Sequence, residues 1–174
     1  MRSNHTRVVV LTLLGVSMLV AQSAFASRWT ATASTCAIGV DQVGDSGIYT
    51  ITGGSALTFS GSNTGEIKAR CNVTNPLDSG VPTWSTLTVG YQDPDGELTT
   101  YQVQVTLYRV KKGTGDYEKV KTFDSNKFGD INPKSNYVTF SHTFDFTSYS
   151  YWVTLDLVRN DSASNPSVWF VELN

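Results

Sequence analysis

The sequence predicts an all-β protein: a single antiparallel β-sandwich, jelly-roll or immunoglobulin-like, with about eight or nine strands. Three observations predict this fold. Apolar and polar residues alternate with a period of two in several segments, no segment sustains the 3.6-residue period of an amphipathic helix, and turn-forming residues recur at short intervals. Residues 27–174 provide enough chain for one such domain and too little for two comfortable ones.

Residues 1–26 have the order of a secretory signal peptide. Arg2 and Arg7 precede an apolar run from Val8 to Ala21, and Ala24-Phe25-Ala26 provides a small-residue cleavage site. The run is shorter than the roughly 20 residues that a transmembrane helix needs, so we predict cleavage after Ala26 and no transmembrane anchor. The two arginines are not adjacent, which favours a Sec-type signal and a secreted or periplasmic product.

Two cysteines, Cys36 and Cys71, are the only ones in the chain. In an oxidising compartment such a pair usually forms a disulfide, and closing a loop of this length is worth about 3–4 kcal/mol. A zinc site lacks ligands, because two thiolates and one distant histidine do not complete a set of four. We therefore predict a Cys36–Cys71 disulfide and no metal.

The strand candidates follow one another along the chain. Those with a clear period of two are Glu66 to Thr74, Ser85 to Tyr91, Tyr101 to Leu107, Val138 to Phe146 and Tyr151 to Leu157. Weaker candidates are Ile48 to Thr52, Ala56 to Ser60 and Val168 to Leu173, and the pattern does not decide the inward face of the last. Gly, Pro, Asn and Asp cluster between the segments, as turns require.

The composition disfavours several functions. The net charge is −2, which gives no basic surface for nucleic acid, and no glycine-rich loop opens a helix to bind a nucleotide. Outside the signal segment the only histidine is His142, and the alternation turns it inward between Phe140 and Phe144. We therefore expect a hydrogen-bonded core imidazole rather than a catalytic base, and predict no enzyme activity and no cofactor. The sequence does not exclude a glycosidase, which needs two carboxylates that face each other across a cleft.

An acidic string and a basic hairpin are further candidates. Asp93, Asp95 and Glu97 could offer oxygens to calcium, but Pro94 and Gly96 equally make this string a strand connection. Five cations gather on the arms of one predicted hairpin, where they form either an anion-binding patch or a solvated edge; they are Arg109, Lys111, Lys112, Lys119 and Lys121.

Aromatic residues that the strand alternation does not direct into the core are the candidate ligand contacts. Trp152 and Tyr108 lie on the polar faces of their predicted strands, and Trp84 lies just ahead of a strand. Exposed rings at such positions stack on sugars; alternatively they pack beneath long loops. We take Trp84, Tyr108 and Trp152 as the candidate glycan contacts.

Several stretches together resemble a group of small exported bacterial proteins. These stretches are RCNVTNP, W-x-TL-x-V-x-Y-x-DPDG, Y-x-V-x-V-x-L-x-RV, FSHTFDF and NPSVWFVEL. The resemblance implies a signal peptide, a cysteine pair and one sandwich domain, and it implies no activity. A weaker resemblance to chaperone-usher pilins rests on the spacing of the cysteine pair. Here only nine residues would precede Cys36, and no penultimate tyrosine ends the chain.

The sequence therefore predicts an exported, non-catalytic β-sandwich, a cell-envelope or extracellular binding module whose partner is a glycan or another envelope component. The alternative is a structural or pilin-like subunit of a surface assembly, held together by strand addition.

Overall fold

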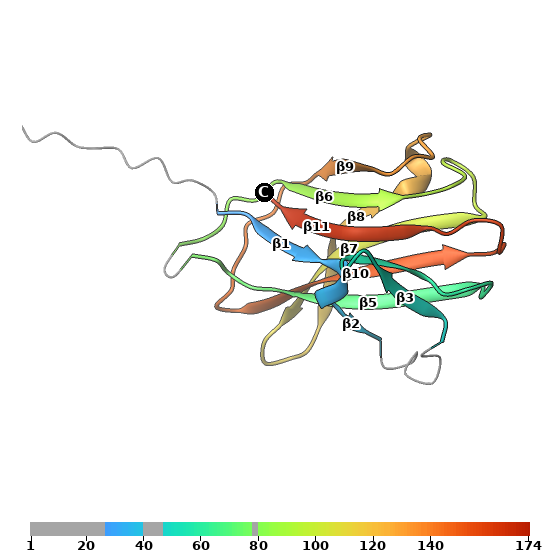
Figure 1. Ribbon diagram of the computed structural model, residues 1–174. Helices are drawn as coiled ribbons and strands as arrows, with labels where there is room; N and C mark the ends of the chain where they lie inside the picture. Colours follow the sequence, from blue (N-terminus) through green and yellow to red (C-terminus); the bar gives the residue numbers. More distant parts are fainter. Residues whose placement is uncertain (1–26, 40–46, 78–79) are drawn as a thin grey trace, which may run out of the picture.

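The computed structural model describes residues 27–39, 47–77 and 80–174, which form two antiparallel sheets packed face to face (Figure 1). The predicted all-β sandwich is confirmed, with eleven strands in these residues where about eight or nine were expected. The predicted signal peptide, residues 1–26, lies outside the described part of the chain. Within that part, no helix has the length and apolar character to cross a bilayer.

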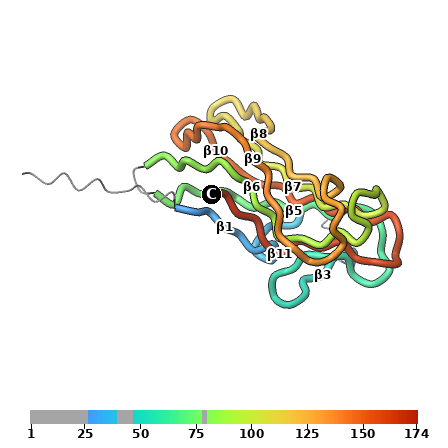
Figure 2. The backbone as a smooth tube through the Cα atoms, turned by 90° about the horizontal axis from the view of Figure 1, so that it is seen from above, coloured from blue at the N-terminus to red at the C-terminus, as the bar shows by residue number. Residues whose placement is uncertain are grey.

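The first sheet has the order β3-β4-β11-β6-β9, with β1 also paired to β11, and the second has the order β2-β5-β10-β7-β8. The first sheet contains β1 (Trp29–Thr32), β3 (Tyr49–Thr52), β4 (Ala56–Phe59), β6 (Thr86–Gln92), β9 (Lys134–Thr139) and β11 (Ser167–Leu173). The second contains β2 (Ala37–Ile38), β5 (Gly65–Val73), β7 (Tyr101–Lys111), β8 (Tyr117–Asp124) and β10 (Tyr149–Arg159). The start of β1 and the end of β11 lie at the same end of the sandwich (Figure 2).

The core follows the predicted alternation. In β10, for example, Tyr151, Val153, Leu155 and Leu157 are buried, while the residues between them reach the outer surface. The same alternation buries every second residue of β5 from Ile67 to Val73. Each long strand of the second sheet therefore has one face in the core and one face outside.

The strand predicted from Val138 to Phe146 is displaced. β9 ends at Thr139, and the following residues form no ladder, although Phe140 still donates its backbone N–H to the Ser85 carbonyl. Phe144 is buried nonetheless and packs edge-on against Trp84, with 4.9 Å between the ring centroids. The phenylalanines alternate because they close one end of the core from a loop, which sequence periodicity does not distinguish from a strand.

The sequence pattern does not decide which residues of β11 face the core, and the structure gives the reason. The register between β11 and β6 shifts between Val168 and Phe170, so Val168 and Val171 both face the core although they are three residues apart. Gly90 pairs with Phe170 across this irregularity. A Cβ atom at Gly90 would overlap the side chains of Phe170 and Trp169. The glycine thus provides the room that the irregular strand needs.

The predicted disulfide is confirmed: Cys36 and Cys71 are bonded, with 4.5 Å between their Cα atoms. Both cysteines are buried and belong to the hydrophobic core. Cys71 lies on the inward face of β5, and Cys36 follows the short 3₁₀ turn η1 (Ala33–Thr35). The bond ties the N-terminal segment to β5 of the second sheet.

We expect the double variant Cys36→Ala/Cys71→Ala to lose about 3 kcal/mol of unfolding free energy, because its unfolded state regains the freedom of the open loop. Urea denaturation of the oxidised protein and the variant measures the difference. Reduction of the wild-type protein should give a loss of similar size, and equal midpoints before and after reduction would contradict the prediction.

We expect Gly90→Ala to lower the unfolding free energy by about 1–3 kcal/mol, the usual effect of overpacking a core. Gly47→Ala is the matched control, because no atom of the described part of the chain lies within 4 Å of a Cβ placed there. Thermal or urea denaturation of both variants tests this, and equal stabilities would show that β11 shifts freely.

Candidate functional site

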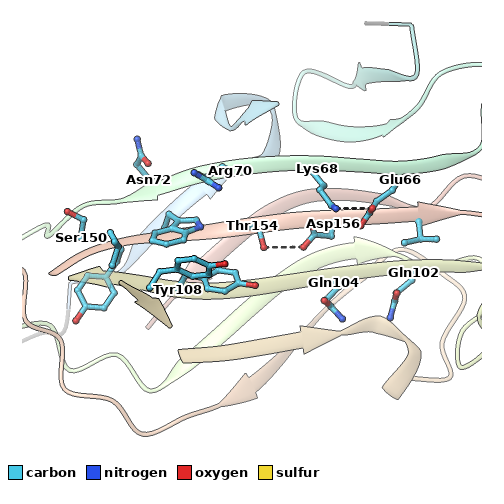
Figure 3. Close-up of a pocket in the computed structure, with 15 residues that line it drawn as sticks. Glu66, Lys68, Arg70, Asn72, Gln102, Gln104, Tyr108, Ser150, Thr154 and Asp156 are labelled. Carbon is cyan, nitrogen blue, oxygen red and sulfur yellow. Dashed lines mark hydrogen bonds and ion pairs between the residues drawn. The ribbon is translucent and has the colours of Figure 1, made fainter. Parts of the chain in front are cut away.

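A groove of about 800 Å³ lies on the outer face of the second sheet. Its polar lining comes from three neighbouring strands, β5, β10 and β7 (Figure 3). The labelled lining residues are Glu66, Lys68, Arg70 and Asn72 from β5, Ser150, Thr154 and Asp156 from β10, and Gln102, Gln104 and Tyr108 from β7. Trp152, Tyr117 and three further residues complete the lining.

Strand register brings these side chains together. Trp152 lies opposite Asn72 on β5 and opposite Tyr108 on β7. Because alternate residues of a strand share a face, Thr154 and Asp156 follow Trp152 along the same side of β10. The alternation that directs every second residue of these strands into the core therefore directs the residues between them into the groove.

Three aromatic rings gather at one end of the groove. Tyr108 and Trp152 are stacked, with centroids 5.3 Å apart and an angle of 12° between the rings. Tyr117 lies 6.1 Å from Tyr108 and 6.2 Å from Trp152. Tyr117 is 70% exposed, whereas the other two rings are half-buried. It is therefore the most accessible ring of the cluster.

The Arg70 guanidinium lies over the ring of Trp152, with 5.2 Å between its carbon Cζ and the ring centroid. Together with Tyr108, this contact makes the Trp152 ring part of a layered stack. The indole Nε1 is buried and has no acceptor among the described residues. A buried donor without a partner costs stability, so this nitrogen is an unsatisfied polar group beneath the groove.

The other end of the groove is polar. Lys68 forms an ion pair with Glu66, with 3.0 Å between nitrogen and oxygen, and Thr154 donates a hydrogen bond to Asp156. Burial raises the pKa of Asp156 above its usual range, while the hydroxyl of Thr154 acts in the opposite direction. The two carboxylates of the groove are thus each held by a neighbouring side chain.

The structure brings together two of the three aromatic residues that the sequence suggested. Tyr108 and Trp152 lie side by side in the groove, whereas Trp84 is only 1% exposed. The expectation of an exposed Trp84 is wrong, because its ring fills the core beside Phe144 and its Nε1 donates to the Ser27 carbonyl. It is not positioned to contact a ligand.

Sequence reasoning missed Tyr117. It is the first residue of β8, and the hairpin register places it opposite Val110, one residue along β7 from Arg109. The turn residues 113–116 contained the necessary signal, since a hairpin closed there sets this register.

His142 lies in the loop after β9 and is half-buried. Its Nε2 is hydrogen-bonded to the Tyr151 hydroxyl at 3.1 Å, and its ring packs edge-on against Phe144. Burial lowers the pKa of His142, and the nearby Arg109 lowers it further. The expected hydrogen-bonded imidazole is present, at the margin of the core rather than within it.

The predicted basic hairpin is formed by β7 and β8. Arg109 forms an ion pair with Glu118 and lies 4.4 Å over the ring of Tyr149, while Lys112 donates to the Phe146 carbonyl. Two of its five cations are thus already engaged within the protein.

The acidic string forms a connection between β6 and β7. Asp93 is fully buried and accepts a hydrogen bond from Ser125, while Asp95 accepts from the backbone N–H groups of Thr100 and Tyr101. Gly96 has a φ of 65°, as a tight turn favours. Among the described residues, no three His, Cys, Asp or Glu side chains are grouped to hold a metal ion, so Glu97 completes no such set.

No protein-family model matches the chain, and no curated protein matches it in sequence. Solved structures similar in shape include a family 36 carbohydrate-binding module in complex with calcium and xylotriose, with a TM-score of 0.47, 14% identity and coverage of 84% of this chain and 99% of that one.

Two further similar structures are carbohydrate-binding modules. The family 61 module in complex with β-1,4-galactotriose has a TM-score of 0.42, 13% identity and coverage of 85% and 88% of the two chains. The low-affinity xylan-binding module of family 86 from Roseburia intestinalis has a TM-score of 0.41, 11% identity and coverage of 85% and 95%. None of these three is a pilin. At these identities no ligand or site residue transfers to this chain.

We expect Asp93→Asn to change how stability depends on pH. Burial raises the pKa of Asp93 to about 7 from an ordinary value of 3.8, while Ser125 lowers it and Asp95 raises it. A raised folded-state pKa stabilises the fold at low pH, and this stabilisation is lost as the pH rises through about 7.

Between pH 4 and pH 8 the wild-type protein should therefore lose stability relative to Asp93→Asn, whose side chain does not ionise. Urea denaturation across this range measures the difference, with Asp116→Asn, an exposed turn residue, as the control. Parallel pH profiles for the wild-type protein and Asp93→Asn would contradict the prediction.

Proposed function

We propose that the protein is an exported, non-catalytic glycan-binding module that holds its ligand in the groove of the second sheet. The observation that carries the proposal is the aromatic cluster of Tyr117, Tyr108 and Trp152, with Tyr117 exposed, beside a continuous row of polar side chains. Sugars present apolar C–H faces and hydroxyl edges, so they match a surface that combines rings with hydrogen-bonding groups. Export rests on the signal-like N-terminal sequence.

The polar part of the groove suits hydroxyl groups. Asn72, Gln102 and Gln104 carry amides, each of which both donates and accepts hydrogen bonds, as a sugar hydroxyl does. They lie on β5 and β7, on either side of β10. A chain of sugars running along β10 would have amides on both of its sides.

Binding without hydrolysis is part of the proposal. A glycosidase needs one carboxylic acid and one free carboxylate on opposite sides of the scissile bond. Here Glu66 is paired with Lys68, and Asp156 is hydrogen-bonded by Thr154. Incubation with bound glycans should release no reducing ends, and release that Asp156→Asn abolishes would establish a hydrolase instead.

The assembly role that the sequence left open finds less support. The C-terminal strand β11 lies inside its sheet, with β6 on one side and β4 and β1 on the other. A subunit that exchanges strands would polymerise when purified. A stable monomer would remove this alternative and leave the glycan proposal intact.

We expect Tyr117→Ala to weaken glycan binding about five- to tenfold, because an aromatic contact of this kind contributes about 1 kcal/mol. Tyr137→Ala is the matched control: Tyr137 is 62% exposed but lies on β9, in the other sheet. A glycan array, with calcium and with chelator, followed by calorimetry on the best ligand, measures the effect. No binding to any glycan in either condition would overturn the proposal.

A further inference from the structure

We propose that the groove selects glycans whose neutral backbone carries isolated anionic groups, and that Arg70 binds the anion. The inference rests on the proposed function and specifies its ligand class. The shared chemistry is an oxyanion on a sugar, either a uronic carboxylate or a sulfate ester, and the experiment below distinguishes these two sources.

Arg70 is held in place while its hydrogen-bonding groups stay open. It is an exposed residue at the centre of the labelled row on β5, and its guanidinium lies 5.2 Å from the Trp152 ring centroid (Figure 3). Among the described residues, no carboxylate or carbonyl oxygen pairs with this guanidinium. A guanidinium that lies over an aromatic ring still has N–H donors for other partners, and its fork of donors binds an oxyanion with two hydrogen bonds.

The other charges along the groove limit where an anion can bind. Lys68 is paired with Glu66, and Asp156 lies opposite Lys68 across the strand pair. Lys68 and Glu66 lie two and four positions along β5 from Arg70, which corresponds to about 7 and 13 Å. An anion at Arg70 thus meets a cation, whereas an anion further along the groove meets Asp156 and Glu66.

The aromatic end of the groove favours an uncharged sugar ring. Tyr117 and Tyr108 offer apolar faces there, and Asn72 lies opposite Trp152 with an amide. A ligand with one charged substituent between neutral residues would therefore satisfy the whole groove. A polymer with a charge on every residue would place some of them against Glu66 and Asp156.

Four immobilised glycans test the inference. The first is glucuronoxylan, which carries uronic groups at intervals on a neutral backbone, and the second is the same material after chemical reduction of its carboxyl groups. The third is polygalacturonate, which is charged on every residue, and the fourth is a sparsely sulfated neutral glucan. We expect the wild-type protein to bind glucuronoxylan about tenfold more tightly than its reduced form or polygalacturonate. Binding of the sulfated glucan shows that the site takes either oxyanion, and its absence restricts the site to carboxylates.

Arg70→Gln should remove this tenfold preference, so that the variant binds native and reduced glucuronoxylan equally. Lys127→Gln, which makes the same charge change at an exposed position on the 3₁₀ turn η3 (Ser125–Lys127), should keep the preference. Equal binding of native and reduced glucuronoxylan, or a preference that survives Arg70→Gln, would overturn the inference but leave the proposed function standing. Failure of all four glycans and of the array would instead count against the proposed function itself.

Discussion

The pairing of β10 with β5 on one side and β7 on the other is the constraint on which the rest of the structure depends. Because β10 is central, its inward residues Val153 and Leu155 are fixed in the core, and its outward residues Trp152 and Thr154 are fixed in the groove. A shift of one residue would exchange the two sets and bury polar groups. The burial that stabilises the sandwich therefore also positions the side chains of the groove.

The layered contact of Arg70, Trp152 and Tyr108 gives the groove its most specific feature. Both neighbours of the indole limit the access of a ligand to its faces, so Trp152 acts mainly as a support. The ring that remains open is Tyr117, which is 70% exposed. With Trp152 as a half-buried support and Tyr117 as the exposed contact, less side-chain freedom would be lost on binding, because only the exposed ring has to be ordered.

The predictable part of the fold was the part encoded locally. Alternation along β5, β7 and β10 identified the core and the outward positions of Tyr108 and Trp152, because a strand places its residues on two faces whatever its neighbours are. The remainder depends on contacts between distant segments. Trp84 is buried by the loop that carries Phe144, and the phase of β11 depends on the space left by Gly90. Neither is visible in a short sequence window.

The sheet alone fixes the positions of the site residues, but it does not shield them from water as the core is shielded. Its residues lie on neighbouring strands of one sheet, so the backbone beneath them is fixed by ladder hydrogen bonds before any ligand arrives. The groove is nevertheless open along its length, and its polar groups remain in contact with water, which weakens each hydrogen bond to a ligand. In the proposed role, affinity for a neutral glycan then depends on a few aromatic contacts. In the same proposal, discrimination between ligands depends on Arg70, because it is the one guanidinium of the groove lining and no described residue neutralises it.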